Sequence, residues 1–209
     1  MDKFMENSQF YYVHDPMCSW CWAHRPQWDQ FKKALESRNI PVEYVVGGLA
    51  PDSDKPMPEE QKETVSGYWR KIEALLGTPF NHDFWNSATP RRSTYPACRA
   101  VIAAKSQQAE EKMIHALQEA YYLRALNPSD VSTHELLAAE LGLDVSKFSN
   151  ELASNELEAE FNRQLRFAHS MPISGFPSMV LKHNDQWHSI VLDYKDYSGA
   201  LAQVEEILS

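Results

Sequence analysis

A chain of 209 residues, 43 % of them hydrophobic, is long enough to bury one domain, or a small domain that carries a sizeable insertion. Its formal charge of −9, from 20 basic and 29 acidic residues, argues against a nucleic-acid partner, because nucleic acids reward clustered lysine and arginine. No apolar run approaches the length of a membrane helix, and residues 1–8 carry two acids without an apolar stretch, so we expect a cytoplasmic protein with no signal peptide and no membrane contact.

The first quarter of the chain has the pattern of a strand, a helix and a second strand. Residues 10–13 are an apolar run, and Pro16 behind them cannot continue a ladder of hydrogen bonds. A helix is expected over 18–37, because apolar residues recur there at i, i+3 and i+7. Residues 42–46 predict the second strand. Elements of these lengths in this order predict a parallel βαβ unit.

Between residues 57 and 170 the pattern is helical almost throughout. No period of roughly 20–50 residues repeats, which excludes a solenoid and favours a compact helical unit. One of the helices is expected to begin at a capping box, Ser132-Thr133-His134-Glu135, and to stop at Gly142. The other helices are expected over 58–76, 96–105, 108–125, 145–153 and 155–169.

Strands return after residue 171. Residues 178–182 and 187–192 predict a hairpin, and a closing helix is expected over 197–208. The full order is β-α-β, helices, β-β-α, which predicts an α/β protein with a thioredoxin-like fold interrupted by a large all-helical insertion. The expected domains are a thioredoxin-like domain of residues 8–56 and 171–209, and a helical insertion domain of residues 57–170.

Two cysteines, Cys18 and Cys21, lie where the first strand gives way to the first helix. The thiol of Cys18 is expected over the free N–H groups at the positive end of the helix dipole, which stabilises its thiolate. Cys21 follows one turn later, close enough to close a small disulfide ring or to resolve a mixed disulfide. Three cysteines in a reducing cytoplasm do not suggest a disulfide framework, so the pair predicts a thioredoxin-like redox site.

Two other uses of the pair stay open on the residues alone. The cysteines are half of a zinc site if a second pair of ligands exists, but the neighbours of Cys98 offer no ligand pattern. A structural disulfide is the other use, although so short a loop removes little chain entropy. Redox activity is the favoured interpretation, and no metal is expected.

Four stretches of the sequence carry a family resemblance. They are residues 15–22 (DPMCSWCW), 47–49 (GGL), 93–100 (STYPACRA) and 175–178 (GFPS). Together they resemble the DsbA-like thioredoxin-fold family, and within it the cytoplasmic FrnE-like branch. The resemblance implies a protein-disulfide oxidoreductase or isomerase that exchanges a Cys18–Cys21 disulfide with thiol- or disulfide-containing proteins or with glutathione. It implies no cofactor besides this redox disulfide.

The resemblance also implies roles, position by position. Cys18 is expected to be the nucleophile and Cys21 the resolving thiol. Pro177 is expected to be a cis-proline that faces them, and Phe176 to offer backbone groups to an extended substrate. The other expected site residues surround the pair: Ser19, Trp20 and Trp22 as substrate contacts, and His24 as a residue that tunes the cysteines.

The residues around the pair give further expectations. Asp15 is expected to turn the chain in front of the cysteines, and Cys98 to be a buried core thiol. An isolated histidine such as His24 is more often a surface residue than a functional one. Tyr68 and Trp69 belong to a group of aromatics expected in the core, with the alternative that some of them line the cleft between the two halves of the molecule.

Two rival functions are weighed against the redox interpretation. A glutathione-dependent isomerase or transferase of the kappa type, similar to 2-hydroxychromene-2-carboxylate isomerase, shares this layout but carries a serine at the position of Cys18. A redox-inactive peptide-binding module would use the same cleft without electron transfer. The intact pair Cys18 and Cys21 argues against both rivals.

Overall fold

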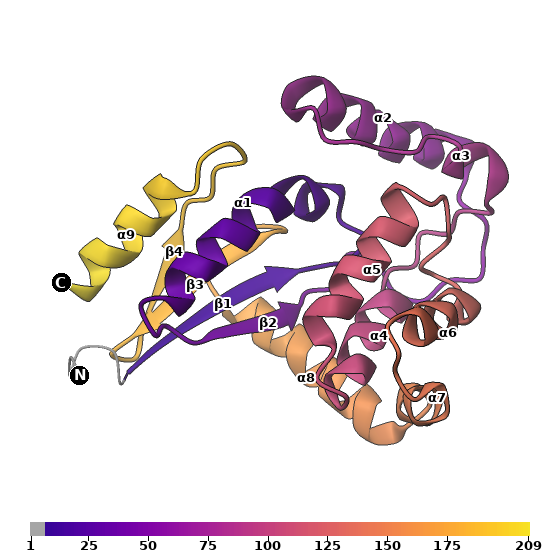
Figure 1. Cartoon of the computed structure of the whole chain (residues 1–209). Coiled ribbons are helices and arrows are strands. Elements are labelled where there is room, and N and C mark those ends of the chain that lie inside the picture. The colour runs from indigo at the N-terminus through magenta and orange to yellow at the C-terminus, as the bar shows by residue number, and fades with distance from the viewer. Residues whose placement is uncertain (1–6) are drawn as a thin grey trace.

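A four-stranded sheet forms the centre of the molecule in a computed structural model that describes residues 7–209 (Figure 1). The strands are β1 (Ser8–His14), β2 (Val42–Val46), β3 (Ser178–His183) and β4 (Gln186–Ile190), in the order β2-β1-β3-β4. β2 is parallel to β1, whereas the pairs β1–β3 and β3–β4 are antiparallel. The predicted βαβ unit and hairpin are therefore confirmed. The expectation of no signal peptide rests mostly on residues 1–6, which lie outside the described residues.

Helices cover both faces of the sheet (Figure 1). They are α1 (Ser19–Glu36) and α9 (Ser198–Leu208) on one face, and α8 (Asn155–Ser170) on the other. Successive side chains of β1 alternate between the faces. Tyr12 stacks on Trp28 of α1 with 3.8 Å between the ring centroids, whereas Tyr11 meets Phe167 of α8 edge-on at 5.3 Å. Burial of each such side chain stabilises the fold by roughly 1.5–3 kcal/mol, so β1 is held from both sides.

The remaining helices lie between β2 and β3 in the sequence. They are α2 (Glu59–Leu76), α3 (Phe84–Ser87), α4 (Tyr95–Lys105), α5 (Glu110–Tyr122), α6 (Val131–Glu140) and α7 (Val145–Leu152). α4 packs against α5, α6, α7 and α8, and most of its side chains are small and buried, so its neighbours approach it closely. None of the helices in the described part of the chain is long and apolar enough to cross a membrane.

The predicted helices agree with the structure to within a few residues, with two exceptions. α3 was not predicted, because its four residues are too few to show helical periodicity. The capping box at Ser132 is wrong: α6 begins one residue earlier, at Val131, and Asp130 occupies the N-cap position. Thr133 lies in the first turn of α6, where its backbone N–H donates to the carbonyl of Asp130 at 3.0 Å.

α8 belongs to the helical segment in sequence but packs against the sheet. Its Gln164 accepts a hydrogen bond from the backbone N–H of Val46 at 3.0 Å, at the end of β2. Ala168 of α8 lies in a buried cluster with Val45 and Val180. The division of the chain at residue 170 therefore stays a prediction, and α8 contributes to both the sheet layer and the helical layer.

Candidate active site

Cys18 lies at the N-cap position of α1, as predicted. Asp15 turns the chain in front of it: one carboxylate oxygen accepts from the N–H of Met17 at 2.8 Å, and the Asp15 carbonyl accepts from the N–H of Cys18 at 3.0 Å. The carbonyl of Cys18 then accepts the first hydrogen bond of the helix, from Trp22 at 3.1 Å. The first turn of α1 contains no acidic residue, and its N–H groups present the positive end of the helix dipole to the sulfur.

The loop before β3 faces Cys18 from the other side. The thiol of Cys18 donates to the carbonyl of Phe176 at 3.4 Å, and the peptide bond from Phe176 to the buried Pro177 is cis. Gly47 explains part of this arrangement, because a β-carbon at that position would lie 2.0 Å from the ring of Phe176. The structure thus brings together the 47–49 and 175–178 stretches beside the cysteines.

Both cysteines are buried. Cys18 is 6 % exposed and Cys21 is 1 % exposed, and both are free thiols. Exchange requires an exposed nucleophile, so Cys18 is more enclosed than this chemistry led us to expect, because Phe176 covers one side of its sulfur. Cys18 nevertheless lines an open cleft, whereas Cys21 faces the interior. Burial, followed by the neighbouring Cys18 thiol, raises the pKa of Cys21 well above its usual value.

The cleft at Cys18 has a volume of about 420 Å³ and separates the start of α1 from α2. Of the predicted substrate contacts, Ser19, Trp20 and Phe176 line it. Trp22 does not: its indole N–H donates to the carbonyl of Pro79 at 3.0 Å, and its ring joins an aromatic cluster outside the cleft. The far wall of the cleft was not predicted, and it consists of Leu49, Gln61, Thr64, Val65, Tyr68 and Arg92.

Tyr68 is 48 % exposed and lines the cleft, which is the second of the two places expected for these aromatics, and not the core. It projects from α2 into the cleft wall, whereas its neighbour Trp69 is fully buried as expected. Arg92 brings a positive charge to the same wall. The helical periodicity of residues 58–76 separates the two faces of α2 but does not tell which face meets the cysteines, so the sequence held no signal for these contacts.

His24 is buried at 2 % exposure, which contradicts its expected surface position. Its Nδ1 lies 3.1 Å from the hydroxyl of Tyr12, and its ring meets Tyr194 edge-on at 5.5 Å. Burial lowers the pKa of His24 to about 4, against an opposing effect of the Asp193 carboxylate. His24 is therefore uncharged at neutral pH, and it cannot tune the cysteines through a positive charge.

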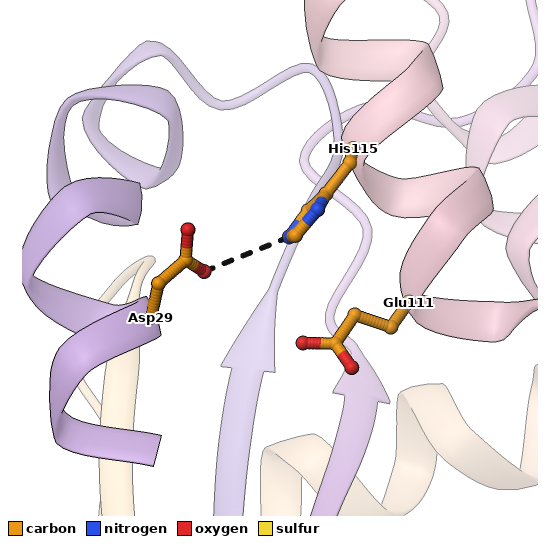
Figure 2. A group of neighbouring side chains, drawn as sticks. All are labelled: Asp29, Glu111 and His115. Atoms are coloured by element: carbon orange, nitrogen blue, oxygen red, sulfur yellow. Dashed lines mark ion pairs between the residues drawn. The ribbon is translucent and has the colours of Figure 1, made fainter. Parts of the chain in front are cut away.

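Asp29, Glu111 and His115 form a group of possible metal ligands between α1 and α5 (Figure 2). His115 Nε2 lies 3.7 Å from Asp29 Oδ1. The charge of this group is already offset, since Asp29 pairs with Arg25 at 3.9 Å and Glu111 with Lys32 at 3.2 Å. The side chains of Arg25 and Lys32 already offset the two carboxylate charges, so we assign no metal to the group.

Asp15 joins three of the four sequence stretches beneath the cysteines. It is fully buried, and its second carboxylate oxygen accepts from the N–H of Leu49 at 2.8 Å, the hydroxyl of Thr94 at 2.6 Å and the thiol of Cys98 at 3.6 Å. Burial raises the pKa of Asp15, and these hydrogen bonds oppose the rise. Cys98 is fully buried as expected, and burial together with the Asp15 charge raises its pKa.

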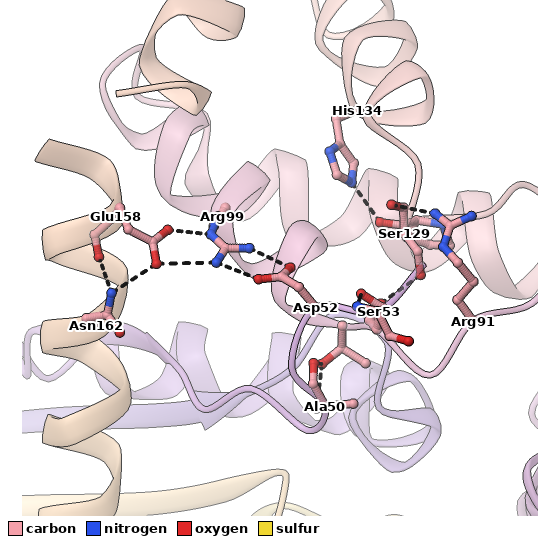
Figure 3. Close-up of polar contacts among 12 residues, drawn as sticks. Ala50, Asp52, Ser53, Arg91, Arg99, Ser129, His134, Glu158 and Asn162 are labelled. Carbon is pink, nitrogen blue, oxygen red and sulfur yellow. Dashed lines mark hydrogen bonds and ion pairs between the residues drawn. The ribbon is translucent and has the colours of Figure 1, made fainter. Parts of the chain in front are cut away.

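Ion pairs fix the loop that follows Leu49 onto the helical segment (Figure 3). Arg99 of α4 pairs with Asp52 in this loop and with Glu158 of α8, both at 2.7 Å. Arg91 donates to the carbonyl of Ser129 at 2.9 Å, just before α6. The loop is thus held to α4 by the Asp52 side chain, and its backbone by the carbonyl of Ala50, which accepts from the N–H groups of Thr94 and Tyr95 at 3.0 and 3.2 Å.

Comparison with known proteins agrees with this fold. The model of the family described as Thioredoxin matches residues 10–200. A ClpXP adapter protein SpxH from Bacillus cereus is 28 % identical over 182 residues, which cover 83 % of this chain and 59 % of that protein. The chain thus spans about three fifths of the length of the curated relatives it matches.

Similar solved structures add to the assignment of the fold. A candidate protein disulfide isomerase from Nitrosomonas europaea has a TM-score of 0.84 at 24 % identity, with 97 % of this chain and 98 % of that chain covered. The cytosolic disulfide reductase DsbM from Pseudomonas aeruginosa, also solved with GSH, has a TM-score of 0.76 at 23 % identity, with 96 % and 100 % covered. A 2-hydroxychromene-2-carboxylate isomerase has a TM-score of 0.61 at 15 % identity, with 96 % and 95 % covered. From the family match and this shared architecture, the chain belongs to the thioredoxin family and has the fold of its DsbA-like members.

Proposed function

We propose that this protein is a thiol–disulfide oxidoreductase that exchanges a Cys18–Cys21 disulfide with thiol- or disulfide-containing substrates. One observation carries the proposal. Cys18 lies at the N-terminus of α1, in an open cleft, with its sulfur 3.4 Å from the carbonyl that precedes Pro177. Cys21 lies one turn behind it in the interior. A nucleophile in front and a shielded thiol behind are what a two-step exchange requires.

In the first step the Cys18 thiolate attacks a substrate disulfide. A mixed disulfide forms, and the other substrate sulfur leaves as a thiolate that takes a proton from water. In the second step the Cys21 thiolate attacks the Cys18 sulfur, and the remaining substrate sulfur leaves. The substrate gains two electrons, and the pair becomes a disulfide that two external thiols can reduce again. Phe176, with its carbonyl beside the Cys18 sulfur, would pair with the backbone of an extended substrate at this point.

We also propose glutathione as a small-thiol substrate. A cleft of about 420 Å³ lies within the range of roughly 300–1,000 Å³ that is usual for small-molecule sites. Its wall offers the guanidinium of Arg92 for a carboxylate and the side chains of Gln61 and Thr64 for amide groups. That DsbM was solved with GSH is consistent with this choice. A reducing cytoplasm would supply this thiol, which agrees with the expected localisation.

The test separates the two cysteines. We expect Cys21→Ser, incubated with oxidised glutathione, to hold one glutathione on Cys18, because Cys18 can attack but nothing resolves the adduct. We expect Cys18→Ser to gain almost none, since Cys21 is shielded. Intact mass spectrometry measures both, and the buried Cys98→Ser variant is the matched control, expected to behave like the wild type. Equal adducts on the two single variants would contradict the assigned roles.

Two other functions have support of their own. The isomerase fold match favours a kappa-type glutathione-dependent isomerase, in which activity would survive Cys18→Ser and would not need Cys21. The adapter name of the curated relatives favours a peptide-binding module, in which a partner would still bind after both cysteines were replaced. Insulin reduction by the wild type that is lost in Cys18→Ser would separate the oxidoreductase from both alternatives.

A further inference from the structure

A small cavity lies directly behind Cys21. It is enclosed by side chains of β1, β2, α1 and α5: Tyr12, Tyr44, Cys21, Arg25, Trp28, Ile114, His115 and Gln118. The volume in which the centre of a water molecule fits is about 10 Å³, so the cavity has room for a single water molecule. Cys21 lines this cavity and not the substrate cleft, so the resolving thiol faces this small space and the few polar side chains on its wall.

Two polar side chains on the cavity wall have unused hydrogen-bonding atoms. The amide oxygen of Gln118, a residue only 3 % exposed, has no partner among the described residues. Nη1 of Arg25 likewise has none there. Buried polar atoms rarely stay unpaired, and ordered water is a frequent partner where the space is polar and large enough. A donor and an acceptor on facing elements suit one bridging water.

His115 lines the same cavity. Its side chain is 28 % exposed, so it reaches solvent, and its Nε2 lies 3.7 Å from Asp29 Oδ1 (Figure 2). Burial lowers the pKa of His115, and Arg25 adds to this, while the nearby carboxylates oppose it. The imidazole is thus held mostly in its neutral form, in which one ring nitrogen can accept a hydrogen bond. The charged or titratable groups around it are Arg25, Asp29 and Lys32 on α1, Glu111 and Glu119 on α5, His14 on β1 and Tyr44 on β2.

The resolving step needs such an acceptor. Cys21 must lose its proton before it attacks, yet burial opposes its ionisation. Asp15, the buried carboxylate near the pair, already accepts hydrogen bonds from Met17, Leu49 and Thr94, and it does not line the cavity. His24 does not line it either.

We propose that one water molecule in this cavity carries the proton of Cys21 to His115 when Cys21 resolves the mixed disulfide. The inference rests on the proposed oxidoreductase function. The Cys21 thiol gives its proton to the water, and the water gives one to the ring of His115. The Cys21 thiolate then attacks the Cys18 sulfur, and the electron pair of the Cys18–substrate bond leaves with the substrate sulfur. The imidazolium passes its proton to solvent, while Gln118 positions the water.

The test measures the resolving step alone. Reduced protein is mixed with oxidised glutathione between about pH 6 and 9, quenched with acid, and the decay of the Cys18 adduct is followed by mass spectrometry. We expect His115→Gln to form the adduct at the wild-type rate but to resolve it about tenfold more slowly at pH 7. Hydroxide should replace the missing acceptor, so the difference should shrink toward pH 9. His169→Gln, on the exposed end of α8, is the matched control and should overlap the wild type.

A second variant tests the water itself. Gln118→Leu keeps the volume of the side chain and removes the amide, so we expect the same step to slow with an unchanged capture rate. Circular dichroism of both variants checks that the fold is retained. Resolution by His115→Gln or by Gln118→Leu with the wild-type rate and pH profile would overturn this inference and leave the oxidoreductase function intact. A wild-type protein that forms no adduct would overturn the function, and the inference with it.

Discussion

The packing of Gly47 against Phe176 gives a prediction whose size can be worked out. A β-carbon at residue 47 would lie 2.0 Å from Cε1 and 2.1 Å from Cζ of the ring. Carbon atoms in contact lie about 3.5–4.0 Å apart, so the Gly47→Ala change must displace the ring by roughly 1.5 Å. The ring is the free end of a half-buried side chain, so it can rotate without separating the backbone segments. We expect a loss of about 1 kcal/mol in the free energy of unfolding.

The Gly47→Ala change should lower the rate of thiol–disulfide exchange more than it lowers the stability. Phe176 lines the cleft at Cys18, so a displaced ring occupies space that a substrate needs. We expect Gly47→Ala to capture oxidised glutathione about tenfold more slowly, which corresponds to about 1.4 kcal/mol. Urea unfolding and the rate of adduct formation measure the two effects.

The matched control is another glycine with free space around it. At Gly67, inside α2, an added β-carbon would meet only Arg70 Nη2, at 4.0 Å. Gly67→Ala should therefore raise the free energy of unfolding by about 0.5–1 kcal/mol, because alanine favours a helix interior. The reasoning is refuted if Gly47→Ala unfolds at the wild-type urea concentration and captures glutathione at the wild-type rate.

Two further predictions concern stability. Burial lowers the pKa of His14 to about 3 and of His24 to about 4, so the folded chain excludes protons that the unfolded chain binds below about pH 6.5. The free energy of unfolding should be highest above pH 6.5 and should fall by about 2 kcal/mol per histidine between pH 7 and 5. Urea unfolding measures this change, and an equal free energy of unfolding at pH 7 and pH 5 would contradict the prediction. Arg99→Ala should lower the free energy of unfolding by about 1 kcal/mol, because it removes the partner of two carboxylates, Asp52 and Glu158. Arg163→Ala breaks an exposed pair and should lower it by less than about 0.5 kcal/mol. Equal losses in the two variants would contradict the stabilising role of the Arg99 ion pairs.

The helices and strands whose apolar residues recur at a regular spacing could be predicted from the sequence. The strands and long helices follow from periods of two and 3.6, and the position of Cys18 at the start of α1 follows from the change between them. α3 was not predicted, because a helix of four residues is too short to show a periodic spacing of apolar residues. The start of α6 was misplaced because several residues near Ser132 can cap a helix, and only the fold selects Asp130.

The parts of the site that long-range packing creates could not be predicted. The wall of the cleft that carries Tyr68 and Arg92 depends on where α2 lies, and no local pattern fixes that. The burial of His24 depends on Tyr12 and Tyr194, which are distant from it in sequence and contact it only in the fold. Asp15 was correctly expected to turn the chain, but its contacts with Thr94 and Cys98 join segments about 80 residues apart.

The distance along the chain between the two halves of the site matters during synthesis. Cys18 and the carbonyl of Phe176 are 158 residues apart in sequence. A ribosome that adds about 5–20 residues per second takes roughly 10–30 s to cover that interval. Over that time the βαβ unit carries its thiols without the segment that later covers Cys18, and β1 also lacks its partner β3. The nascent chain therefore passes through a period in which the Cys18 sulfur is open to oxidants and to other emerging thiols, and this period ends when β3 completes the sheet.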